Sequence, residues 1–207
     1  MKSQKKLFIF LLILFISPFL KAQEINLPIN VRDRGSLAEL HLSQIGVFGL
    51  WRKERPKVPA HFHTGIDIMR PGNNYENNPI FPIAEGIVIS KRDDGPFAQL
   101  IIEHHQNGKT FWSAYEHISG IRVNVHDIVP PAKPIARFMN QNELNNYGWQ
   151  FDHFHLEILK EAPIRLKADQ ANPYRHFNSF TLICYTKNDL EKLFYAPLTF
   201  FEQNLKE

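Results

Sequence analysis

The chain of 207 residues is 43% hydrophobic and 22% charged, with a formal net charge of +3 at pH 7. These values suit one ordinary globular core and exclude a disordered or fibrous protein. The positive charge comes from the first 22 residues, which hold four lysines and no acid. Their removal lowers the basic count from 24 to 20 against 21 acidic residues, a net charge of −1, so composition gives no support for nucleic-acid binding.

The N-terminal segment has the build of a secretory signal peptide. Three lysines precede a mostly apolar run over residues 7–20, and Lys21 and Ala22 follow it. The run is shorter than the ~20 residues that a membrane-spanning helix needs, and Pro18 lies near its end. We therefore expect cleavage of residues 1–22 and export to the periplasm or the medium, with no stable membrane span afterwards. An uncleaved anchor is the alternative.

The segment from residue 23 to about residue 58 carries few regular signals and is interpreted as an extension laid over the domain, with residues 23–44 outside the domain itself. Its basic cluster is interpreted as a solvated loop and consists of Arg52, Lys53, Arg55 and Lys57.

From Ile80 onward the sequence turns to short runs rich in Ile, Val, Phe and Tyr, such as IFPIAEGIVIS, FAQLIIEHH, KTFWSAYEHIS and PIARFM. Turn signals such as DDG and QNG separate the runs at intervals of about 10 residues, which favours an antiparallel β domain. His104 and His105 end one run at a turn, where we expect exposure to solvent.

The C-terminal part predicts two short amphipathic helices that pack on the domain. Asn188 is a plausible cap for apolar residues at helical spacing, and Pro197 is a plausible first residue of the second helix. Cys184 is the single cysteine, so it cannot form an internal disulfide, and its apolar surroundings predict a small buried side chain.

The histidines are the chemically informative residues. Three short patterns concentrate them: HFHTGID at 61–67, AYEHIS at 114–119 and DHFH at 152–155. Because side chains alternate along a strand, His153, His155 and Glu157 share one face of the predicted strand, and its apolar residues share the other.

Such a set fits a hydrolytic zinc site. That site needs three ligands from His, Asp or Glu and one open position for a water, whose pKa the metal lowers to about 7. His63 and Asp67 can supply two ligands and His155 the third. A base and a donor to the developing oxyanion are also needed, and His153 and His117 are well suited. Spacing alone does not decide which histidine is a metal ligand and which is catalytic, and His61 is an alternative ligand to His63.

HTGIDI, YEHIS and HFHLEI, in this order, resemble the HxxxD, YxH and HxH motifs of the lysostaphin-type, LytM-like zinc endopeptidases, which are peptidoglycan hydrolases. The resemblance covers residues 45–162, the predicted zinc peptidase domain, and leaves 163–207 as a C-terminal extension. It implies a mainly β fold of the duplicated-hybrid-motif type, an antiparallel sheet with a groove and Zn²⁺ on its floor. The implied zinc ligands are His63, Asp67 and His155, and the implied catalytic residues are His117 and His153, with His153 as general base and His117 as transition-state stabiliser.

Other positions leave alternatives open. Tyr115 matches a frequent family tyrosine or is a packing aromatic. Glu157 either orients a ligand or faces solvent, and solvent is our expectation. The segment MNQNELNNYGWQFD replaces the usual glycine-rich run before HxH and should reshape one wall. Within it, Trp149 and Phe151 line the groove or anchor the loop.

The resemblance predicts a secreted or periplasmic zinc metalloendopeptidase that cuts peptide cross-links or stem peptides of peptidoglycan. We expect a monomer, although the sequence does not determine the oligomeric state. Two alternatives are a non-enzymatic module on the same fold, which binds cell wall or activates an amidase, and a zinc endopeptidase acting on exported proteins. Which bond is cut, and whether residues 23–58 form a latency segment, is not determined by the sequence.

Overall fold

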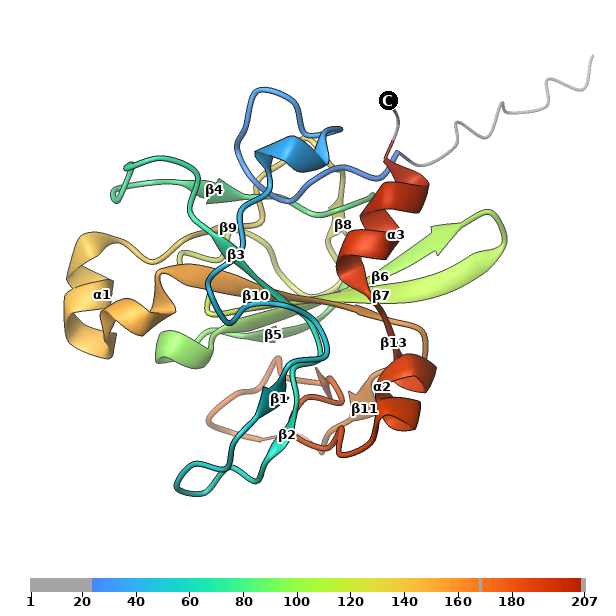
Figure 1. The fold of residues 1–207 in the computed structure, drawn as a ribbon. Coiled ribbons are helices and arrows are strands. Elements are labelled where there is room, and N and C mark those ends of the chain that lie inside the picture. Colours follow the sequence, from blue (N-terminus) through green and yellow to red (C-terminus); the bar gives the residue numbers. More distant parts are fainter. Residues whose placement is uncertain (1–23, 168, 206–207) are drawn as a thin grey trace, which may run out of the picture.

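The computed structural model describes residues 24–167 and 169–205, so the predicted signal peptide lies outside the described residues. A seven-stranded sheet forms its centre, in the order β13-β10-β7-β6-β5-β8 with β3 also paired to β10 (Figure 1). Its pairings are antiparallel, which confirms the predicted mainly β fold. The strands are β3 (Ile66–Met69), β5 (Gly86–Arg92), β6 (Gln99–Gln106), β7 (Lys109–Glu116), β8 (Ile128–Val129), β10 (His153–Leu159) and β13 (Phe194–Tyr195).

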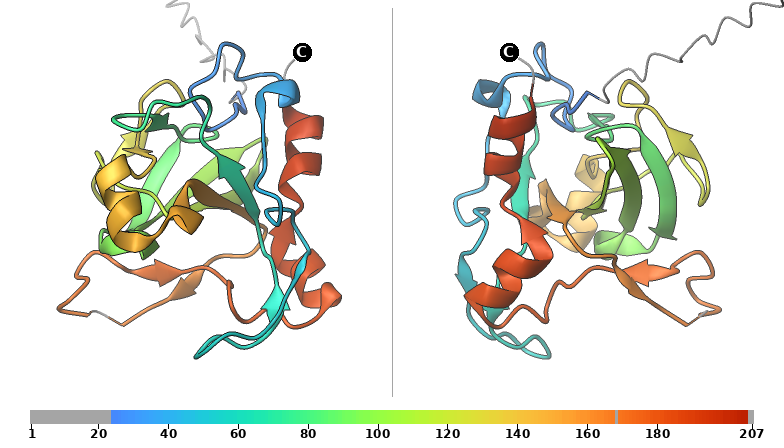
Figure 2. Two further views of the ribbon diagram at one scale, coloured as in Figure 1. Left: turned by 60° about the vertical axis from the view of Figure 1, so that its left-hand side comes forward. Right: turned by 90° about the vertical axis from the view of Figure 1, so that its right-hand side faces the viewer.

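Short strand pairs and helices surround this sheet (Figures 1 and 2). The strand pairs are β1 (Trp51–Arg52) with β2 (His61–Phe62), β4 (Pro79–Ile80) with β9 (Ala136–Arg137), and β11 (Ile164–Arg165) with β12 (Phe177–Asn178). The helices are α1 (Gln141–Tyr147), α2 (Lys187–Leu193) and α3 (Pro197–Asn204), with single 3₁₀ turns η1 (Leu37–Glu39), η2 (Gly95–Phe97) and η3 (Trp149–Phe151). None of the helices in the described part of the chain combines the length and the hydropathy that crossing a membrane requires.

The two faces of the sheet pack against different parts of the chain. On β10, Phe154, Leu156 and Ile158 point into the larger core cluster, which also holds Phe200 and Phe201 of α3. Residues near the N-terminus join the same cluster, namely Ile25, Leu27 and Ile29. Burying each large apolar side chain contributes about 1.5–3 kcal/mol, so both ends of the described chain help to hold this face.

The opposite face is covered over part of its area. Leu159, Trp112 and Ile101 pack there against Cys184 and Leu190 of the C-terminal segment. Cys184 is fully buried, as predicted, and burial raises the pKa of its thiol to about 11. Figure 2 shows the segment that carries β11 and β12 running along this side of the sheet. The remainder of the face is open and carries the polar side chains described below.

The structure corrects three local predictions. His104 is fully buried, because the alternation that buries Leu100 and Ile102 also points its ring into the core. Its ring nitrogens contact the Glu85 carbonyl at 2.8 Å and the Ser113 hydroxyl at 2.7 Å.

Helix α2 begins earlier than predicted. Its cap is Thr186, whose hydroxyl accepts a hydrogen bond from the Asp189 amide, and Asn188 lies inside the helix. The segment before the His-x-His motif contains helix α1, which was not predicted. A reciprocal capping box starts it: Asn140 accepts from the Glu143 amide, and the Glu143 carboxylate accepts from the Asn140 amide.

Candidate metal centre and active site

A row of polar side chains crosses the open face of the sheet. The register places Asp67 opposite His155, His155 opposite Glu116, Glu116 opposite Gln99 and Gln99 opposite Arg92. These five residues come from five neighbouring strands, which are about 4.8 Å apart. Antiparallel pairing therefore brings residues that are far apart in the sequence onto one face of the sheet.

Three candidate ligand atoms meet at one end of this row. His63 Nε2, Asp67 Oδ1 and His155 Nδ1 are each 3.0 Å from the other two. All three residues are buried, at 6–7% exposure, and together they form a group that can hold a metal ion. A tetrahedral zinc with bonds of about 2.0–2.1 Å separates its ligands by roughly 3.3 Å, so the spacing fits after a small expansion.

The other nitrogen of each ring fixes which atom faces this centre. His63 Nδ1 lies 2.9 Å from the Val47 carbonyl, to which it must donate, so Nε2 of the neutral ring carries a lone pair. His155 Nε2 faces Glu157 Oε1 at 3.3 Å, so a proton on that nitrogen leaves Nδ1 for the centre. Both rings can thus direct an unprotonated nitrogen at the same point.

The electrostatics favour a cation at that point. Burial would raise the pKa of Asp67, but contacts with His155 and His63 lower it well below its usual range. Burial would lower the pKa of His155, but Asp67 and Glu157 raise it to about 10. Without a metal, His155 is therefore protonated, with one ring nitrogen facing Asp67 and the other facing Glu157. A divalent cation would instead accept electron pairs from all three ligand atoms, so the residues fit a zinc ion.

Two neighbours hold Asp67 and His155 in place. Arg52 Nη2 donates to Asp67 Oδ2 at 2.9 Å, which leaves Oδ1 for the centre. Gly65 lies so close to β10 that a Cβ there would approach the Leu156 carbonyl oxygen to 2.2 Å and the His155 ring to 2.8 Å. The HTGID pattern therefore needs glycine at this position, because any side chain would displace a proposed ligand.

Glu157 is buried behind His155 rather than exposed, so the solvent-facing expectation was wrong. Its side chain is 1% exposed and accepts hydrogen bonds from the hydroxyls of Thr64 and Thr181. The two hydroxyls are also 2.8 Å apart. A carboxylate behind a metal-binding histidine orients the ring and strengthens it as a ligand. Thr181 belongs to the C-terminal segment, which thus contributes to the centre.

Replacing Glu157 by glutamine is expected to lower zinc affinity about 10–100-fold without unfolding the protein, because the amide keeps the shape of the side chain but loses its charge. Competition with a fluorescent chelator measures the change. Glu103→Gln is the matched control, since Glu103 also contacts a histidine, His105 at 3.0 Å, but lies outside the metal centre. Equal zinc affinity in Glu157→Gln and the parent protein would contradict this role.

His153 and His117 lie beside the three ligand atoms. His153 Nε2 is 3.8 Å from Asp67 Oδ1, and the two rings have centroids 5.4 Å apart. Burial lowers the pKa of each ring to about 4, so both are neutral at pH 7 and can accept a proton. His117 adopts the left-handed backbone conformation with φ 62°, and its ring packs against Phe151 and Phe97.

All five predicted site residues line one cleft of about 510 Å³. Residues before and after the main strands form its walls, including Arg52, Arg55, Arg175 and Thr181. The basic cluster interpreted as a solvated loop thus contributes two arginines to the cleft. The hydrophobic periodicity of the sequence does not predict these wall residues, because they belong to segments that are far apart in the sequence and meet only in the folded protein.

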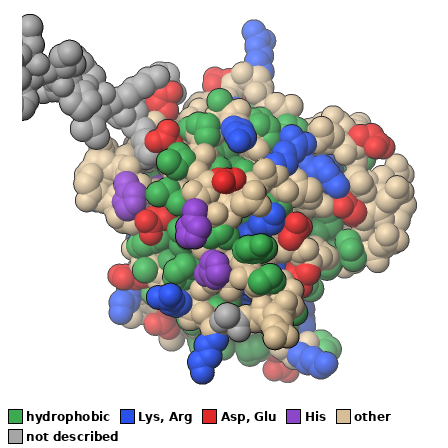
Figure 3. Space-filling view, turned by 180° about the vertical axis from the view of Figure 1, so that it is seen from behind, with side chains coloured by type: hydrophobic (Ala, Val, Ile, Leu, Met, Phe, Trp, Pro, Cys, Tyr) green, Lys and Arg blue, Asp and Glu red, His purple; other side chains and the backbone are tan. Residues whose placement is uncertain are grey.

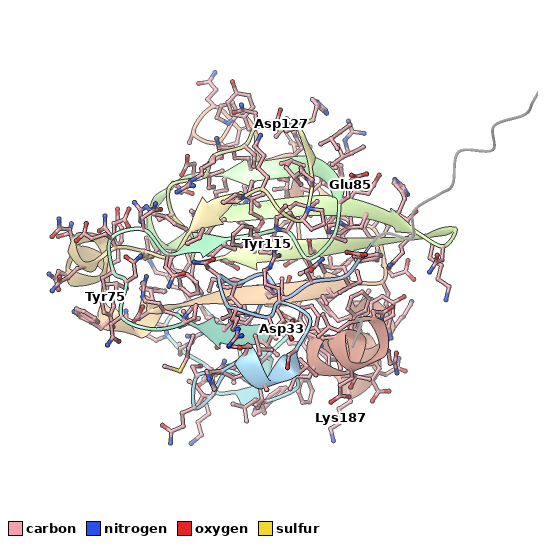
Figure 4. All side chains as sticks on the ribbon, turned by 90° about the horizontal axis from the view of Figure 1, so that it is seen from above. Asp33, Tyr75, Glu85, Tyr115, Asp127 and Lys187 are labelled. Carbon is pink, nitrogen blue, oxygen red and sulfur yellow. The ribbon has the colours of Figure 1, made fainter. Side chains whose placement is uncertain are left out.

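The remaining candidates divide between the cleft and the core. His61 lines the cleft and contacts the Pro59 carbonyl at 2.7 Å, so His63 and not His61 joins the ligand group. Phe151 lines the cleft, whereas Trp149 is 49% exposed and packs on Tyr75. Tyr115 is fully buried on the core face, which Figure 4 shows from above with Tyr115 over the central strands.

The comparison with known families decides the assignment. The model of Peptidase family M23 matches residues 61–173, more than half of the chain. The chain belongs to peptidase family M23. The match contains every one of the three histidine patterns, which confirms the resemblance to lysostaphin-type peptidases. This M23 chain thus carries a buried His63, Asp67 and His155 group consistent with a zinc site.

Solved structures with a similar fold include three of interest. Lysostaphin from Staphylococcus simulans is 16% identical with a TM-score of 0.48, and the match covers 79% of this chain and 51% of that one. A zinc-containing peptidase from Vibrio cholerae is 21% identical with a TM-score of 0.47, and the match covers 66% of this chain and 37% of that one. A chain of the SpoIIIAH–SpoIIQ complex is 16% identical with a TM-score of 0.46, and the match covers 66% of this chain and 92% of that one. No curated protein sequence matches the chain.

Proposed function

We propose that this M23 chain is an exported zinc-dependent endopeptidase that hydrolyses peptide bonds in bacterial peptidoglycan. The observation that carries the proposal is the convergence of His63, Asp67 and His155 on one point of an open cleft, with His117 and His153 beside it. A hydrolytic metal site needs three protein ligands, an open side and a nearby base, and this arrangement offers each of them.

Zinc bound here would supply Lewis acidity, which polarises the scissile carbonyl and acidifies a water. His153 is the proposed general base. Its ring is neutral at pH 7 and lies at the edge of the ligand group, so it can take the proton of the attacking water and return it to the leaving amine. His63 and His155 would hold the metal through the nitrogens that face the centre, and Asp67 would hold it through a carboxylate oxygen.

His117 has a more specific role than the sequence suggested. Its Nδ1 lies 2.6 Å from the Pro96 carbonyl and must donate to it, so Nε2 of the neutral ring is an acceptor. A neutral His117 can therefore receive a proton during the reaction. It can stabilise an oxyanion by donation once that proton is held at Nε2. We propose that His117 and His153 both accept and donate protons during the reaction.

The proposal of a cell-wall substrate is supported by family membership and by the N-terminal sequence, which has the composition of a signal peptide. The cleft is open beside the ligand group, and residues before β3 line it rather than fill it.

The direct test is digestion of purified peptidoglycan by zinc-loaded protein, with products identified by mass. We expect new amino termini, loss of all hydrolysis after chelation and recovery when Zn²⁺ is added back. Zinc-loaded protein that cleaves neither peptidoglycan nor small glycine- or alanine-rich peptides would favour a binding module instead. Cleavage of an exported protein without cleavage of peptidoglycan would assign the same chemistry to a different substrate.

A further inference from the structure

We propose that the cleft selects a peptide with a free carboxylate within about five residues of the cleaved bond, and that Arg175 pairs with this carboxylate. The inference rests on the proposed function, because it names the substrate class of the same cleft. It distinguishes an acidic peptide from an uncharged bridge of glycine or alanine.

Positive charge is concentrated in the cleft walls. The arginines that line it are Arg52, Arg55, Arg92 and Arg175, and the carboxylates that line it are Asp67 and Glu116. On the face shown in Figure 3, acidic and basic side chains are interspersed. The zinc ion proposed in the cleft would add to the positive charge of its arginines.

Two of these arginines already have carboxylate partners. Arg52 pairs with Asp67 at 2.9 Å, and Arg92 pairs with Asp94. Arg55 and Arg175 form no ion pair with any described residue. These two guanidinium groups are therefore available to an anionic ligand.

Arg175 is the better candidate of the two. Arg55 is exposed, and solvent screens an exposed charge. Arg175 is half-buried, its Nη2 donates to the Asn178 side chain at 3.1 Å, and its Nε is buried without a hydrogen-bond partner among the described residues. The guanidinium lines the cleft, and a ligand carboxylate there offers the acceptors that a guanidinium binds best.

The position of Arg175 sets the place of the carboxylate along the peptide. The preceding carbonyl, of Tyr174, accepts from the Lys91 amide at 3.0 Å, which ties this turn to the end of β5. Arg175 and Glu116, the residue opposite His155 in the sheet, both line the cleft. β5 lies three strand spacings from β10, about 14 Å at about 4.8 Å per spacing, and an extended peptide rises about 3.3 Å per residue, so this wall is about four to five residues from the metal centre.

Binding and cleavage of matched peptides test the proposal separately. The probes are alanine peptides that carry a single glutamate, placed in turn at each of the five positions on either side of the central bond, and the same peptides with glutamine. Equilibrium binding is measured on chelated protein, which does not turn the peptides over, and cleavage on zinc-loaded protein. We expect at least one glutamate peptide to bind about 10-fold more tightly than its glutamine partner.

Variants of the β11–β12 segment identify the residue responsible. Arg175→Gln should remove the preference, and Arg175→Lys should keep part of it because the charge remains without the planar fork. Arg165→Gln is the matched control, since Arg165 is exposed in the same segment and does not line the cleft. Circular dichroism checks that the variants are folded.

Each outcome bears on one proposal. Equal binding of glutamate and glutamine peptides, or absence of binding, overturns the carboxylate subsite. A preference that persists in Arg175→Gln overturns the assignment to Arg175. A preference in binding without cleavage of any peptide or of peptidoglycan supports the subsite and counts against the proposed hydrolase.

Discussion

Replacing His63 by alanine is expected to abolish zinc binding and hydrolysis together. His63 Nε2 is one of three atoms that lie 3.0 Å from one another, and its Nδ1 bond to Val47 fixes the ring in the tautomer that a metal requires. The two remaining ligands, Asp67 and His155, should bind zinc too weakly to retain it through dialysis. The loss of affinity should therefore exceed the roughly 10–100-fold that an outer carboxylate such as Glu157 contributes.

Metal analysis after dialysis and digestion of peptidoglycan measure the two effects in parallel. His105→Ala is the control, because that side chain is 61% exposed and lies outside the cleft. Asp67→Asn should behave like His63→Ala, since an amide keeps the shape but removes the negative charge. Stoichiometric zinc in His63→Ala would overturn the proposed centre, and His61 would be the next residue to replace.

Replacing His153 by alanine is expected to leave zinc in place and to lower kcat roughly 10²–10⁴-fold, the usual contribution of a general acid–base residue. The reason is geometric. His153 Nε2 is 3.8 Å from Asp67 Oδ1, close enough to reach a reacting group at the centre but outside the 3.0 Å triangle of ligand atoms. Kinetics with a cleavable peptide, with zinc content measured on the same sample, separates the two roles.

Added imidazole gives a second readout for His153. The space left by the ring lies in the open cleft, so imidazole should restore part of the turnover in His153→Ala, whereas it should not restore His63→Ala without zinc. Loss of zinc from His153→Ala would instead make His153 a ligand and would contradict the assignment. Full activity without this ring would leave His117 as the base.

The buried face of β10 fixes the position of the site residues on its other face. Register in an antiparallel sheet is fixed wherever one face is buried, and here Phe154 and Leu156 bury the opposite face of β10. A shift by one residue would turn His155 and Glu157 into the core. The apolar half of HFHLEI thus holds its chemical half in position.

Several features of the fold and the site could be predicted from local sequence. Strands β5, β6 and β7 follow from short apolar runs between turn signals, and α3 begins at the predicted proline. The placement of His153 and His155 on one face follows from the two-residue period of a strand. Two missed features had local signals as well: Asn140 and Glu143 form a capping box, and the alternation that buries Leu100 and Ile102 also buries His104.

The sequence by itself determined which residue types were available for a metal centre and, through three ordered motifs, the family. Tertiary structure decided which of His61 and His63 joins Asp67 and His155, and that Arg52 and Thr181 support them. The physical reason is distance along the chain: Thr181 and Thr64, whose hydroxyls meet at Glu157, are separated by 117 residues. Such contacts depend on how strands pair and segments cross the sheet, and no local period in the sequence encodes them.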